Sequence, residues 1–147
     1  LSIDEAKDLY DIRAVLEGHA TRLFVKNADS ELVKRLDDAL SVVIFAYKNE
    51  NSERVLKTKN QFYDVLYEGA KSATLGAMLA SLHARVWRWR ALGLSHHNRS
   101  KARSKESMKN LRAILVAIEK GDAETAERIT REEAHKAAEK IMRLLAS

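Results

Sequence analysis

Residues 104–145 read SKESMKNLRAILVAIEKGDAETAERITREEAHKAAEKIMRLL, and this stretch decides the fold class. Apolar residues recur at helical spacing on both sides of Gly121 and Asp122, which predicts two amphipathic helices joined by a tight turn. Gly121 supplies the left-handed backbone position that ends a helix, and Asp122 is a suitable N-cap for the next one. The apolar positions are Met108, Leu111, Ile114, Leu115 and Ile118 in the first helix and Ala126, Ile129, Ala137, Ile141 and Leu144 in the second.

One charged residue interrupts the second apolar stripe. At about 100° per residue, Glu133 falls between Ile129 and Ala137. A carboxylate on an apolar face is costly unless it has a partner. Glu133 is therefore a candidate site residue that needs a cation within the fold.

Composition narrows the fold and the class of protein. A chain of 147 residues is one ordinary domain, and the absence of proline, together with five glycines and 46% hydrophobic residues, favours an all-helical bundle. The absence of cysteine excludes disulfides and thiolate metal sites. No apolar run is long enough to cross a membrane and nothing resembles a signal peptide, so we expect a cytoplasmic protein. The first residue is Leu1 rather than Met, from which we expect a missing amino-terminal part.

The formal net charge of +5 raises the question of direct nucleic-acid binding. Most basic residues are scattered, and the densest group lies in a segment that we expect to be a loop entering a helix. We interpret this group as a solvated loop, with weak steering of DNA toward a separate reading domain as the alternative. The group consists of Arg99, Lys101, Arg103, Lys105 and Lys109.

A first helix is predicted from the capping box Ser2–Glu5 to about Asn27. Its apolar face carries Arg13 close by, with Glu17 one turn later. The two residues can form an ion pair at the edge of the stripe, which contributes little. Alternatively, the Arg13 guanidinium lies over an internal cavity, where its planar fork suits a carboxylate ligand.

The second and third helices follow with a turn at residues 49–52 between them. The second, capped by Asp29 or Ser30, has an apolar face wide enough to contact another subunit. The third is expected from about Glu53 to Glu68, ending at Gly69. Its apolar stripe contains Lys59, and Tyr63 follows one turn later.

A fourth helix is predicted over about residues 73–94. Its basic and aromatic residues resemble surfaces that stack nucleic-acid bases, but helical spacing points them in different directions. We therefore expect the tryptophans to pack in the core or at a subunit interface. Arg85, beside the main apolar stripe, is a second candidate cation for binding a ligand. The cluster comprises Arg85, Trp87, Arg88, Trp89 and Arg90.

Taken together, these features resemble the C-terminal ligand-sensing domain of GntR-family transcription regulators, of the FCD type. The resemblance covers essentially all 147 residues. It rests on LRAIL at 111–115, on the pattern AIxxGDxxxA at 117–126, and on a Y-x-x-R-x-x-x-E pattern formed by Tyr10, Arg13 and Glu17. Phe62 and Tyr63 stand where the family usually has a Phe-His pair.

The resemblance implies an antiparallel bundle of about six helices that encloses a ligand cavity. Residues 1–147 would be the effector-binding and dimerisation domain, and a missing amino-terminal winged helix-turn-helix domain would bind operator DNA. A small-molecule effector and a homodimer are the implied partners, with no membrane.

Many members of this family hold a divalent metal through one Asp and three His. The corresponding positions here are Lys59, Tyr63, Leu111 and Glu133. Lysine is a cation and leucine has no donor atom, so we expect the metal site to be lost and no cofactor to be present. The five histidines show no converging spacing, and we assign each of them a chance or surface role. These are His19, His83, His96, His97 and His135.

Lys59 and Glu133 would both project into the former metal cavity. Because burying either charge alone costs several kcal/mol, we predict that the two side chains lie within salt-bridge reach. The alternative is that both extend to solvent. In the proposed effector site, Arg13, Lys59 and Arg85 supply positive charge and Tyr63 a hydroxyl. Glu133 either orients Lys59 or accepts a hydroxyl of the effector.

No catalytic pattern is present in the sequence: there is no phosphate-binding glycine loop, no HExxH, and no nucleophile with a local base. We therefore do not expect an enzyme. The alternative to a ligand sensor is a helical scaffold without a small ligand, which would dock a partner on the apolar face of the second helix.

Overall fold

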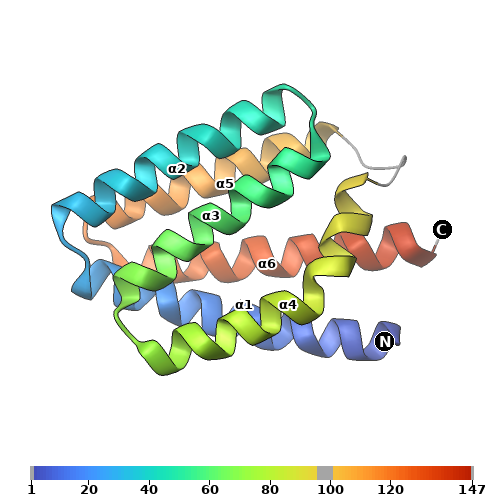
Figure 1. Cartoon of the computed structure of the whole chain (residues 1–147), viewed down its shortest axis with the longest axis horizontal. Helices are drawn as coiled ribbons and strands as arrows, with labels where there is room; N and C mark the ends of the chain where they lie inside the picture. The colour runs from blue at the N-terminus through green and yellow to red at the C-terminus, as the bar shows by residue number, and fades with distance from the viewer. Residues whose placement is uncertain (1, 96–100, 147) are drawn as a thin grey trace.

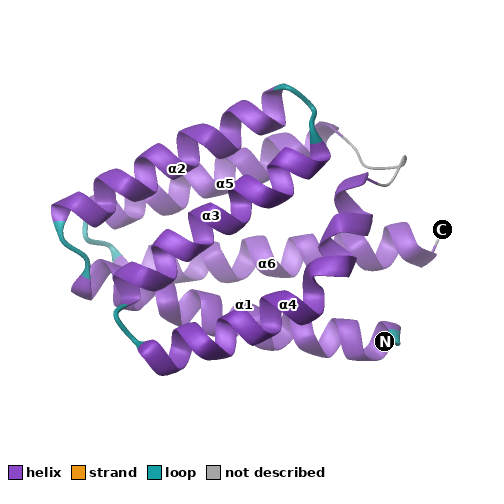
Figure 2. Cartoon of the chain, in the orientation of Figure 1, coloured by secondary structure: helices purple, strands orange, loops and turns teal. Residues whose placement is uncertain are grey.

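The structure is a computed structural model that describes residues 2–95 and 101–146. Arg99, His96 and His97 lie outside the described residues. Figure 2 shows only helices and short connections in this part of the chain, which confirms the predicted all-α bundle. The helices are α1 (Ile3–Asn27), α2 (Ser30–Lys48), α3 (Ser52–Ala70), α4 (Ala73–Ser95), α5 (Lys101–Glu119) and α6 (Ala123–Ala146).

The helices pack so that α3 and α6 have several neighbours each (Figure 1). Helix α6 runs antiparallel to α1 and also contacts α5 and α4, while α3 contacts α1, α2 and α4. The start of α1 and the end of α6 lie at the same end of the bundle. Side chains from α1, α3, α4 and α6 can therefore meet in the interior.

The predicted ends of several helices are confirmed. Gly121 adopts a left-handed φ of 73° between α5 and α6. Asp122 caps α6 by accepting a hydrogen bond from the backbone N–H of Thr125 at 3.1 Å. Ser2 and Asp29 cap α1 and α2 in the same way.

The predicted end of α3 at Gly69 is wrong. The helix continues to Ala70, and Lys71 takes the left-handed position with φ of 55°. Gly69 lies inside the helix, where a Cβ would overlap the ring of Phe24. Close packing of α3 against α1, and not helix termination, requires glycine here.

We expect Gly69→Ala to lower the free energy of unfolding by about 1–3 kcal/mol, since the added methyl group overpacks the contact with Phe24. Gly76→Ala in α4 is the matched control, because no atom lies within 4 Å of the added Cβ. That substitution should raise the free energy of unfolding by about 0.5–1 kcal/mol. Urea unfolding of both variants measures the difference; equal effects would contradict the packing argument.

The apolar core is divided into separate clusters. The largest joins α2, α3 and α5 around Leu36, Phe62 and Ile114, with contributions from α1 and α6. A smaller one joins α1, α4 and α6 around Tyr10 and Val86. Within residues 2–95 and 101–146, every helix is too short or too polar to span a bilayer.

Candidate functional site

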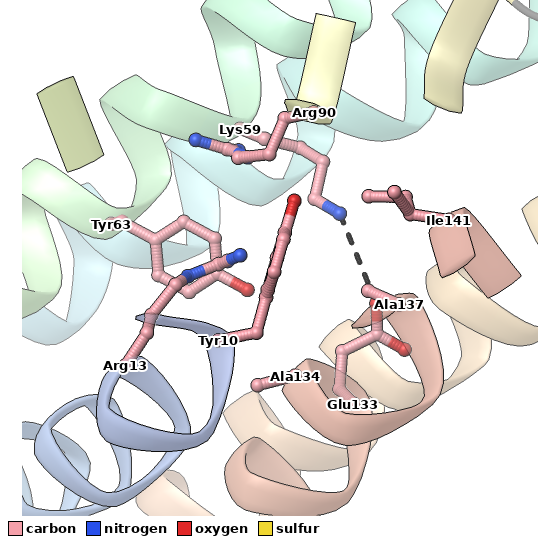
Figure 3. A pocket seen from close by; sticks show the side chains of 9 residues that line it. All are labelled: Tyr10, Arg13, Lys59, Tyr63, Arg90, Glu133, Ala134, Ala137 and Ile141. Atoms are coloured by element: carbon pink, nitrogen blue, oxygen red, sulfur yellow. Dashed lines mark ion pairs between the residues drawn. The ribbon is translucent and has the colours of Figure 1, made fainter. Parts of the chain in front are cut away.

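A partly open cavity of about 40 Å³ lies between α1, α3, α4 and α6 (Figure 3). The resemblance implied such a cavity. Its walls combine cationic, phenolic and apolar side chains. The lining residues are Tyr10, Arg13, Lys59, Tyr63, Arg90, Glu133, Ala134, Ala137 and Ile141.

The buried charges of the described residues do not balance. Four cationic side chains and two carboxylates are buried, which leaves an excess of two positive charges. Burying a charge without a counter-ion costs several kcal/mol. The charged residues are Arg13, Lys59, Arg90 and Arg103 on one side and Glu17 and Glu133 on the other.

The predicted ion pair between Lys59 and Glu133 is confirmed. The distance from Lys59 Nζ to Glu133 Oε2 is 3.8 Å, and Glu133 is 1% exposed (Figure 3). Lys59 lies 9% exposed inside the α3 stripe, so neither charge extends to solvent.

Glu133 has stronger partners on α5 that the sequence did not indicate. Arg103 donates to both of its oxygens, at 3.1 and 2.9 Å. Ser107 donates at 2.8 Å and Asn110 at 2.9 Å. Each Glu133 oxygen thus accepts two hydrogen bonds, which fills its lone pairs. Of the two roles predicted for Glu133, these contacts favour orienting its cationic neighbours over accepting a hydroxyl of a ligand.

The expectation of a loop is therefore wrong for the described residues of this group, which are helical, and the expectation of a solvated side chain is wrong for Arg103. Helix α5 begins at Lys101, and Arg103 is 6% exposed. Helical spacing back from Ile114 through Ser107 places Arg103 on the buried face. Lys101 and Lys105, by contrast, are exposed as expected.

Arg13 lies in both of its predicted positions, beside Glu17 and at the cavity. Its Nε lies 3.1 Å from Glu17 Oε1, but the pair is buried, at 3% and 0% exposure, and not at the edge of the stripe. The guanidinium also lines the cavity, 5.5 Å from the Tyr10 ring centre and 5.7 Å from that of Tyr63. Arg13 therefore presents charge to the cavity while pairing with Glu17.

Glu17 is the centre of a second buried network. Tyr67 donates its hydroxyl to Glu17 Oε2 at 2.7 Å, and His83 Nε2 lies 3.2 Å from the same oxygen. Burial by itself raises the pKa of Glu17, but Arg13 and the hydrogen bonds from His83 and Tyr67 outweigh it and hold the pKa well below its ordinary value. Glu17 is therefore a permanent anion within the bundle.

On α4 it is Arg90, and not the predicted Arg85, that lines the cavity. Arg85 is exposed and does not line the cavity. Arg90, five residues later and therefore rotated by about 140°, is 6% exposed and donates to Asn60 Oδ1. Its Nη2 is buried with no hydrogen-bond partner, and it forms no ion pair with any described carboxylate. Burial lowers the pKa of Arg90.

Two tyrosine hydroxyls face this cationic interior without acceptors. The Tyr10 hydroxyl is buried and has no partner, and the Tyr63 hydroxyl makes no hydrogen bond to a described residue. Burial raises the pKa of both tyrosines, so both remain protonated donors. Arg90 Nη2 likewise has no partner, and Arg90, Tyr10 and Tyr63 all line this cavity (Figure 3).

Tyr10 and Arg90 were missed as site residues although the spacing held a signal. Tyr10, Arg13 and Glu17 lie at i, i+3 and i+7, which places them on one helical face. His83 and Arg90 are also seven residues apart. Polar residues that repeat at this spacing on the otherwise largely apolar faces of two helices indicate a shared polar interior.

The histidines differ from their expected surface roles in one case. His83 is largely buried, between Glu17, Tyr67 and Arg90, and burial lowers its pKa. His19 and His135 are exposed as expected.

The residues at the family's metal positions do not fit a divalent ion. Leu111 is fully buried among apolar side chains, and the Lys59 ammonium lies 3.8 Å from Glu133, where a ligand set would need the ion. No group of three or more His, Cys, Asp or Glu that could hold a metal is found among the described residues.

Glu133 makes the stability of the fold sensitive to acid. Burial raises its pKa, but Lys59 and Arg103 lower it further, to about 2. Because this pKa is lower in the folded than in the unfolded chain, the contribution of Glu133 is complete above about pH 4.5 and is lost as the pH falls toward 2. We expect about 3 kcal/mol of stability to depend on this ionisation.

Urea unfolding at pH 7 and pH 3 measures this dependence. Glu133→Gln should flatten the decline of stability between the two pH values, whereas Glu132→Gln, at an exposed position on the same helix, should not. Parallel curves for the wild type and Glu133→Gln would show that Glu133 is not the group responsible.

Comparisons with known proteins agree with this arrangement. The FCD domain family matches residues 8–135. The solved structure of E. coli McbR/YncC is similar in fold, with a TM-score of 0.83 at 19% identity. The match covers 92% of this chain and 63% of that one, so this chain spans less than two thirds of its length. A comparison with curated proteins gave no match.

Proposed function

Since this chain belongs to the FCD domain family of GntR-type regulators, we propose that it is the effector-binding and dimerisation domain of a bacterial transcription regulator. Its effector is a small organic anion bound in the cavity between α1, α3, α4 and α6. Operator DNA is bound by a separate winged helix-turn-helix domain on the amino-terminal side. The regulator acts in the cytoplasm as a homodimer.

One observation supports an anion as the effector. The described interior has two more cations than carboxylates, and Arg90 Nη2 and the Tyr10 hydroxyl are buried there without an acceptor. A carboxylate provides both the missing charge and the missing acceptors. Arg90 and Arg13 would bind its oxygens, Lys59 would add charge, and Tyr10 and Tyr63 would donate hydroxyl hydrogens.

The cavity is small, so binding of a whole metabolite requires side chains to move, and this movement can regulate the dimer. A volume of about 40 Å³ admits a carboxylate group or a few water molecules. The rest of a metabolite has to displace side chains on at least one of four helices. An effector that favours the displaced arrangement shifts the dimer toward it and changes the spacing of the two DNA-binding domains.

Native mass spectrometry of the purified chain tests this function first, because it reports subunit number, metal content and any copurified metabolite together. Calorimetric titration with malonate, acetate and inorganic phosphate then tests the anion directly, with malonamide as the uncharged control. We expect a dimer that binds a charged probe at one site per subunit and does not bind malonamide. If none of the three anions binds, the proposal is overturned.

A helical interaction module without a small ligand is the second candidate. Val42 and Phe45 on α2 are 50% and 61% exposed, and such a surface can dock a partner. This candidate requires a chain that binds no anion, so the same titration separates the two functions.

A further inference from the structure

The cavity contains Lys59, whose charge would be cancelled by Glu133 if the two were alone. Other groups hold Glu133 more closely. Arg103 donates two hydrogen bonds to it at 3.1 and 2.9 Å, whereas Lys59 Nζ remains 3.8 Å away and its hydrogen bond goes to Ser107 Oγ at 3.5 Å. A bidentate guanidinium pair is stronger than a distant ammonium contact. Glu133 therefore accepts its hydrogen bonds from α5, and Lys59 contributes only a longer ion-pair contact.

Arg103 does not line the cavity. It lies behind Glu133, so any influence on a ligand has to act through Glu133 and Lys59. Glu106 also lies 3.4 Å from Arg103, but Glu106 is 41% exposed and lies 3.8 Å from Lys136. Solvent and Lys136 weaken the Glu106 interaction, so Glu133 is the stronger of these two carboxylate partners of Arg103.

We propose that Arg103 is a positioning residue that determines the anion affinity of the cavity. Its two hydrogen bonds hold the Glu133 carboxylate, so the charge of Lys59 remains available to a ligand. This inference rests on the proposed function. Lysine has a flexible four-carbon chain and one compact charge, so it can move onto Glu133 when Arg103 is absent. The cavity then loses one of its cations without any change in its lining residues.

Arg103→Met should reduce malonate or phosphate affinity by about tenfold, the value of one charge-assisted hydrogen bond. Glu133→Gln should bind at least as tightly as the wild type, because Lys59 has no carboxylate to neutralise it. The double variant Arg103→Met with Glu133→Gln should regain most of the lost affinity. A purely structural role for Arg103 predicts no such recovery, since the double variant lacks both partners.

Two further variants control for charge and for folding. Arg112→Gln removes one positive charge from an exposed position on the same helix and should leave affinity unchanged. Arg103→Lys keeps the charge without the bidentate contact and should lose less affinity than Arg103→Met. If Arg103→Met does not fold, the double variant and Arg103→Lys still provide the comparison.

A measurement without ligand separates this inference from the proposed function. Side-chain ¹⁵N NMR of Lys59 should show a shift in Arg103→Met, as its ammonium moves onto Glu133, and the shift should disappear in the double variant. A wild type that binds neither malonate nor phosphate overturns the proposed function, while the NMR comparison still tests the displacement of Lys59. An unchanged Lys59 resonance in Arg103→Met, unchanged anion affinity, or a double variant as weak as the single one overturns the role of Arg103.

Discussion

Replacing Glu17 by alanine should lower the free energy of unfolding by about 3–5 kcal/mol, the largest effect on stability that we expect. Glu17 is completely buried and pairs with Arg13 at 3.1 Å. It also accepts the Tyr67 hydroxyl and contacts His83. Alanine leaves the Arg13 guanidinium buried without its carboxylate and removes an acceptor that joins α1 to α3 and α4.

Urea unfolding measures this effect, with Asp8→Ala as the control. Asp8 is exposed on the same helix, and its loss should change stability by less than about 0.5 kcal/mol. The double variant Glu17→Gln with Arg13→Met should be more stable than Glu17→Ala, because no unpaired buried charge remains. A Glu17→Ala chain as stable as the control would show that Arg13 finds another counter-ion. The excess of buried positive charge described above would then be wrong.

The sequence was sufficient to predict the features that depend on local periodicity. The six helices, the left-handed position of Gly121 and the cap at Asp122 follow from short-range patterns, and the structure confirms them. The Lys59–Glu133 pair was also predictable, since each charge interrupts an otherwise apolar stripe and burial requires a partner. These predictions need only the face on which a residue lies.

The remaining site residues depend on how the helices are rotated and where they begin. Helix α4 is apolar on two sides, so periodicity could not decide whether Arg85 or Arg90 faces the interior. Arg103 precedes the predicted start of its helix, and without helical register it had no assigned face. Gly69 was interpreted as a helix end because the approach of Phe24 from α1 is a long-range contact that the local sequence does not contain.

Arg90 should show the opposite behaviour to Glu17 when it is replaced. Arg90→Met should reduce malonate or phosphate affinity by about a hundredfold, because the ligand loses a desolvated charged partner. It should not lower the free energy of unfolding. The substitution removes a buried guanidinium whose Nη2 has no hydrogen-bond partner and which forms no ion pair with a carboxylate of the described residues. In the wild type, Arg90 then increases anion affinity without adding to stability, which is typical of functional sites.

The control for Arg90→Met is Arg88→Met, which removes the same charge from an exposed position on α4 and should change neither quantity. Calorimetric titration gives the affinity, and urea unfolding gives the stability of each variant. If Arg90→Met lowers the free energy of unfolding as much as Glu17→Ala does, Arg90 stabilises the fold through Asn60 and His83. Its charge is then not available to a ligand. If affinity is lost while stability is kept, the uncompensated charge of Arg90 belongs to the bound anion.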